Sequence, residues 1–134
     1  MNSEELIENF SYLLDWEDKY RYLIELGEQM SPLPEVERIE KYKVEGCQSQ
    51  VWIKGEKKQD KFYFQAASDA IIVQGLEAVL LTFVNGKTAQ EIQVLDLLEL
   101  FKKLGLEENI SPTRRNGFAS MVQRIYALTN EPNL

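Results

Sequence analysis

The first part of the chain carries hydrophobic residues at helical spacing. In residues 3–14 the apolar positions fall on one helical face: Leu6, Phe10, Leu13 and Leu14. A second stretch with the same period follows Asp15, a typical helix N-cap, and Gly27 is a typical residue to end a helix. The pattern therefore predicts a hairpin of two short helices, the second ending at Gly27.

The middle of the chain alternates between apolar and polar residues with a period of two. Residues 50–54 (QVWIK) and 61–66 (KFYFQA) alternate in this way, which predicts two strands. Three residues of the second strand are expected on one buried face: Phe62, Phe64 and Ala66. The polar stretch 55–60 (GEKKQD) suits the loop of an antiparallel hairpin.

The second half returns to helical patterns. Residues 70–84 are apolar nearly all round, which predicts a buried central helix that Ser68 or Asp69 would cap. A short amphipathic helix is expected to stop at Gly105, and Ser111 followed by proline is a strong start for the last helix. That helix carries an apolar stripe: Phe118, Met121, Val122, Ile125 and Tyr126.

The order of these elements predicts the fold class. Two helices, then strands, then helices indicate an α+β fold, with a small antiparallel sheet of about three strands packed with helices. The length of 134 residues suits one domain, so we expect a single domain over residues 1–134.

Charge and composition narrow the possible partners. The formal net charge is −7, which disfavours binding to nucleic acid or to an anionic membrane. No segment reaches the roughly 20 apolar residues of a membrane span, and the acidic start lacks the pattern of a signal peptide. These observations predict a cytoplasmic protein.

Two absences restrict the chemistry. The chain has no histidine, which excludes catalysis by Ser-His or Cys-His pairs within it. It has one cysteine, Cys47, which excludes intrachain disulfides and cysteine-rich metal or iron–sulfur sites. We therefore expect no cofactor or metal of its own.

The residues around Cys47 allow two interpretations. A lone free cysteine is often a small core residue. However, residues 46–50 (GCQSQ) form a polar, glycine-led segment before a strand, and a cysteine on a loop held by a sheet is well placed for chemistry. With no histidine to activate it, Cys47 suits the role of a sulfur acceptor better than that of an independent enzyme.

Residues 44–53 (VEGCQSQVWI) resemble the cysteine loop of the SufE family, the sulfur acceptors of cysteine desulfurases. Further blocks resemble that family in the same order along the chain: residues 10–27 (FSYLLDWEDKYRYLIELG), 68–75 (SDA followed by IVQG) and 111–117 (SPTRRNG). The likeness covers nearly the whole chain.

The resemblance implies a role and partners. Cys47 would carry sulfur as a persulfide, taken from a pyridoxal-phosphate-dependent desulfurase of the SufS or CsdA type, which the protein would also stimulate. An iron–sulfur scaffold of the SufBCD type would be the downstream acceptor. The fold would be the one that SufE shares with IscU. The protein would be a monomer or a weak homodimer. In that family the cysteine loop rests against an apolar cavity and swings out to the partner.

The resemblance also implies further site residues. The loop residues expected to position Cys47 or to bind the partner are Gly46, Gln48, Ser49 and Gln50. Asp69 corresponds to an aspartate beside the cysteine loop, although it could instead cap the central helix. Arg114 corresponds to the arginine of the 111–117 block and would bind the desulfurase or stabilise a thiolate. Alternatively, it is a solvated arginine in the first helical turn.

Two other functions compete with a sulfur carrier. In the first, the protein regulates a desulfurase without carrying sulfur, and the loop is a docking surface. In the second, it is a thiol enzyme that needs no partner, which the missing histidine disfavours.

Overall fold

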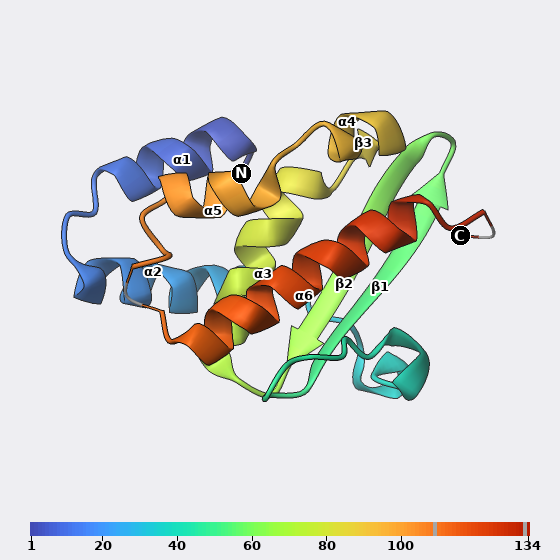
Figure 1. Cartoon of the computed structure of the whole chain (residues 1–134), viewed down its shortest axis with the longest axis horizontal. Helices are drawn as coiled ribbons and strands as arrows, with labels where there is room; N and C mark the ends of the chain where they lie inside the picture. The colour runs from blue at the N-terminus through green and yellow to red at the C-terminus, as the bar shows by residue number, and fades with distance from the viewer. Residues whose placement is uncertain (109, 133) are drawn as a thin grey trace.

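The computed structural model describes residues 1–108, 110–132 and 134 of the chain. Within these residues, six α-helices pack with a three-stranded antiparallel sheet, which confirms the predicted α+β class (Figure 1). The helices are α1 (Ser3–Ser11), α2 (Trp16–Gln29), α3 (Ile71–Val84), α4 (Ala89–Gln93), α5 (Leu97–Lys103) and α6 (Pro112–Thr129). The strands are β1 (Val51–Lys58), β2 (Lys61–Ser68) and β3 (Lys87–Thr88), and two short 3-10 turns, η1 (Glu35–Glu37) and η2 (Glu40–Tyr42), precede the sheet.

The sheet has the order β1-β2-β3 and buries one face. Phe62, Phe64 and Ala66 are all buried, as their alternation predicts. The expected loop over residues 55–60 is wrong, because β1 and β2 stay paired out to Lys58 and Lys61. The charged residues Glu56, Lys57, Lys58 and Lys61 are all exposed at this end of the hairpin. The turn is therefore short and includes a left-handed residue, Gln59, with φ 60°.

Helices α3 and α6 cover the buried face of the sheet (Figure 1). α3 is the predicted central helix, and most of its residues are buried. The apolar stripe of α6 is confirmed as part of the core, with Phe118, Met121, Val122 and Ile125 buried. Both helices begin near the start of β1, so they bring their apolar residues to the segment that contains Cys47.

Helices α2 and α3 cross closely at two glycines. Gly27 does not end α2, which continues to Gln29. A Cβ on Gly27 would lie 2.9 Å from the backbone nitrogen of Gly75, so the glycine is required by contact between helices rather than by a helix end. The prediction that Gly27 ends the helix is wrong, because this glycine is explained by a contact with a distant helix that the local sequence does not show.

Within the described residues, no helix combines the length and apolar character needed to cross a membrane.

Candidate functional site

The loop of residues 45–50, which contains Cys47, leaves the sheet at the start of β1. Its base is closed by a hydrogen bond of 2.8 Å from the Val44 backbone N–H to the Val51 carbonyl. Gly46 has φ +86°, and a Cβ there would lie 2.6 Å from Ser120 Oγ on α6. The positive φ agrees with the conformational freedom expected of this glycine, and the close approach to α6 is a second reason for it.

Asp69 anchors the other end of the loop. Its carboxylate accepts a hydrogen bond of 3.0 Å from the Gln50 backbone N–H, and its own N–H donates to the Gln50 carbonyl at 3.3 Å. The alternative, that Asp69 or Ser68 caps α3, is wrong: the N-cap is Ala70, and Ser68 Oγ accepts only from the Ala70 N–H. The structure thus favours the loop interpretation of Asp69 over the cap.

Replacing Asp69 with alanine should loosen this anchor. We expect alkylation of Cys47 by iodoacetamide to be about fivefold faster, because a lost hydrogen bond of about 1 kcal/mol makes loop opening correspondingly easier. Asp69→Asn is the matched control, because its amide oxygen can still accept from Gln50. Equal alkylation rates in the wild type and Asp69→Ala would show that the anchor does not control the loop.

A second clamp, which the sequence did not suggest, holds the segment before the loop. Arg124 on α6 donates to the carbonyl oxygens of Lys41, at 2.8 Å, and Lys43, at 3.5 Å. Nothing in the sequence marks this arginine, because its partners lie more than 80 residues away. With this clamp and Asp69 in place, residues 45–49 are the part of the segment least restrained by the fold.

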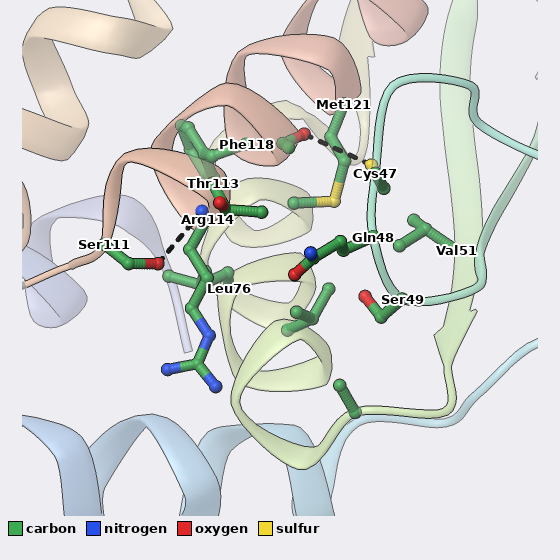
Figure 2. Close-up of a pocket in the computed structure, with 13 residues that line it drawn as sticks. Cys47, Gln48, Ser49, Val51, Leu76, Ser111, Thr113, Arg114, Phe118 and Met121 are labelled. Atoms are coloured by element: carbon green, nitrogen blue, oxygen red, sulfur yellow. Dashed lines mark hydrogen bonds between the residues drawn. The ribbon is translucent and has the colours of Figure 1, made fainter.

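Cys47 is half-buried and faces α6. Its thiol donates a hydrogen bond to the Gly117 carbonyl with a sulfur–oxygen distance of 3.6 Å (Figure 2). The side chain also packs against the edge of the hydrophobic core. Neither sequence interpretation describes Cys47 fully. It lies on a loop, but its side chain is partly sheltered against the core.

A cavity of about 260 Å³ lies between the loop and the start of α6 (Figure 2). Loop residues Cys47, Gln48 and Ser49 form one wall. The apolar part of the lining comes from β1, the start of α3 and α6: Val51, Ala70, Val73, Leu76, Phe118 and Met121. The sequence predicts that several of these residues are buried. It does not predict that they line one cavity, because they come from three elements that are brought together only by the fold.

Arg114 lies at the rim of this cavity, in the first turn of α6. Ser111 is the N-cap of the helix, as predicted, and accepts from the Arg114 backbone N–H at 3.3 Å. The Arg114 side chain is exposed and extends away from the Cys47 sulfur in Figure 2. It forms no salt bridge within residues 1–108, 110–132 and 134. This placement suits contact with a partner better than stabilisation of a thiolate.

The surroundings of Cys47 favour the neutral thiol. Burial, and then the acidic side chains of Glu77 and Glu45, raise the pKa of Cys47. Burial also raises the pKa of Glu77 to about 9, so Glu77 is itself neutral near pH 7. Burial is therefore the main cause of the raised pKa of Cys47. A protonated thiol is a poor nucleophile, so the resting site is protected from reaction rather than poised for it.

The chain and its fold have relatives among known proteins. Residues 4–129 match the family model of SufE, described as an Fe-S metabolism associated domain. An uncharacterized SufE-like protein of Rhizobium meliloti (strain 1021) is 44% identical over 126 residues, covering 91% of this chain and 90% of that protein. One of Rhizobium etli is 47% identical over 126 residues, covering 91% and 85%. The solution structure of a hypothetical protein from Thermus thermophilus has a similar fold, with a TM-score of 0.78, 20% identity, and coverage of 96% and 93%.

Proposed function

Because this chain belongs to the SufE family, whose domains work in sulfur transfer with cysteine desulfurases, we propose that it is a sulfur carrier and that Cys47 accepts the sulfur. The observation that carries the proposal is the position of this single cysteine. It lies on a short loop, anchored at both ends, and is half-buried beside a cavity. The sulfur would pass on to iron–sulfur cluster assembly in the cytoplasm.

The transfer itself is an exchange between sulfur atoms. Cys47 loses its proton, and the thiolate attacks the outer sulfur of a persulfide on the desulfurase. A new S–S bond forms on Cys47 while the donor S–S bond breaks, and its electron pair leaves on the donor cysteine, which can take up a proton. No external oxidant or reductant is needed.

The partner, rather than this chain, would supply the conditions that deprotonate the Cys47 thiol. It has no histidine, and the pKa of Cys47 is raised at rest. The desulfurase would draw the loop away from α6, which relieves the burial that keeps the thiol protonated. Pyridoxal phosphate acts in the desulfurase, and the carrier contributes only the acceptor cysteine. The exposed residues Arg114, at the rim of the cavity, and Gln48, on the loop, are those we propose for the docking contact.

Intact-mass measurement tests the proposal directly. The protein is incubated with a desulfurase of the SufS type, pyridoxal phosphate and L-cysteine. We expect a mass increase of one sulfur atom that dithiothreitol reverses. Cys47→Ser should show no increase, because the chain has no other cysteine.

The same experiment separates a carrier from a regulator. If Cys47 carries sulfur, the desulfurase should turn over faster with the wild type than with Cys47→Ser. Equal stimulation by both proteins, without a mass increase in the wild type, would contradict the carrier and favour a regulatory module.

A further inference from the structure

The resting contact of Cys47 has no room for a second sulfur. The Sγ atom lies 3.6 Å from the Gly117 oxygen. An S–S bond is about 2.05 Å long, so an outer sulfur placed along this line would lie within about 2 Å of that oxygen. Non-bonded atoms pack at roughly 3.5 Å. Loading therefore removes the hydrogen bond to the Gly117 carbonyl, because sulfur replaces the thiol hydrogen, and the outer sulfur must point away from that oxygen.

The adjacent cavity offers a place for the outer sulfur. Cys47 borders the cavity, which has a volume of about 260 Å³. A water molecule takes about 30 Å³, and one sulfur atom is of similar size, so the outer sulfur fits without displacing the walls. Rotation of the Cys47 side chain is sufficient, and the loop keeps its anchors at Val44 and Asp69.

Gly117 lies where the thiol and the cavity meet. It borders the cavity, and a Cβ on it would lie 3.5 Å from Cys47 Sγ and 3.9 Å from Cys47 Cβ. The thiol could tolerate such a methyl group, because these are ordinary contact distances. An outer sulfur bonded to Sγ would lose much of its space on that side. Glycine is otherwise less favourable than alanine inside a helix.

We propose that Gly117 is a positioning residue that distinguishes the two states of Cys47. Its carbonyl holds the empty thiol, and its missing side chain lets the outer sulfur of the persulfide turn into the cavity. This inference rests on the proposed function and goes beyond it, because it assigns a resting place to the sulfur. The loaded sulfur then lies against Met121, Leu76 and Val73, where thiols in solution reach it more slowly than they would on an exposed loop.

The methionine methyl groups provide a test in the wild-type protein. The chain has three methionines, and only Met121 lines this cavity, so Met1 and Met30 are internal controls. After the desulfurase loads the protein, the ¹³C-methyl NMR signal of Met121 should shift and return on reduction. Loading confirmed by mass with no shift at Met121 would overturn the inference.

Gly117→Ala tests the role of the residue. We expect loading to the same mass and an unchanged rate of thiol alkylation, but removal of the persulfide by dithiothreitol about fivefold faster, because the outer sulfur is more accessible. Asn116→Ala, on the same turn but outside the cavity lining, should match the wild type.

The outcomes separate this inference from the carrier itself. Absence of sulfur on the wild-type protein contradicts the proposed function. Normal loading with equal persulfide lifetimes in Gly117→Ala and the wild type contradicts only the role of Gly117. Faster alkylation of the empty Gly117→Ala thiol by the same factor also contradicts it, because the methyl would then act on both states alike.

Discussion

Replacing Glu77 with leucine should raise the stability of the protein by about 3 kcal/mol at pH 7. Glu77 lies on α3 with 1% of its surface exposed, and neither of its carboxyl oxygens has a hydrogen-bond partner among the described residues. Burial raises its pKa from 4.5 to about 9, and the positive charge of Arg38 offsets only part of this. Leucine has a similar size and no polar group to bury, so it removes this cost.

The effect should depend on pH with a defined sign. Between about pH 4.5 and pH 9 the folded protein keeps the Glu77 proton and the unfolded chain does not. The contribution of Glu77 to the free energy of unfolding is therefore fully present below pH 4.5. It falls by about 1.4 kcal/mol per pH unit as the pH rises to 9. The stability difference between the wild type and Glu77→Leu should widen with pH over this range.

Urea unfolding at several pH values measures this difference. Glu77→Gln is the matched control, because it cannot ionise but still buries a polar group. It should remove the pH dependence while gaining less stability than leucine. A difference between Glu77→Leu and the wild type that stays constant from about pH 5 to about pH 9 would show that Glu77 does not titrate as described.

Gly75→Ala should destabilise the protein by about 3 kcal/mol, at the upper end of overpacking effects. A Cβ on Gly75 would lie 2.7 Å from the Leu23 carbonyl carbon and 3.1 Å from Leu23 Cβ. The nearest obstacle is the backbone of α2, which cannot rotate away as a side chain can. The two helices would have to separate, although alanine is the better helix former by about 1 kcal/mol.

Thermal or urea unfolding checks this expectation. Gly117→Ala is the matched control, because it adds the same methyl group inside a helix at an ordinary contact distance of 3.5 Å. It should be as stable as the wild type or more stable. If Gly75→Ala proves equally stable, the helices can adjust and the close crossing is not required.

Features set by neighbouring residues could be predicted from the sequence. Asp15 and Ser111 cap their helices as expected, because a cap acts on backbone groups two or three residues away. The buried alternation of Phe62 and Phe64 also follows from local geometry. The polar surroundings of Cys47 and the family resemblance predict that it is the sulfur acceptor, and the structure places it on a loop beside a cavity.

Features that depend on distant contacts could not be predicted. Gly27 was placed at a helix end because its true neighbour, Gly75, is 48 positions later. The sequence allows the Asp69 carboxylate either to cap α3 or to bind the cysteine loop, and only the fold brings the Gln50 backbone N–H within reach. Arg124 and Gly117 gave no local sign of their contacts with the cysteine segment.

The closed base of the cysteine loop limits how far sulfur can be carried by movement of the loop alone. Cys47 is three residues from Val44, whose hydrogen bond to Val51 closes the base. A fully extended chain spans at most about 3.5 Å per residue, so the tether gives the cysteine a reach of about 10 Å. A donor and an acceptor docked at separate places lie beyond such a radius. On the proposed function, movement of the loop alone cannot carry sulfur between two distant docking sites, so we expect donor and acceptor to bind in turn at the same face of the carrier.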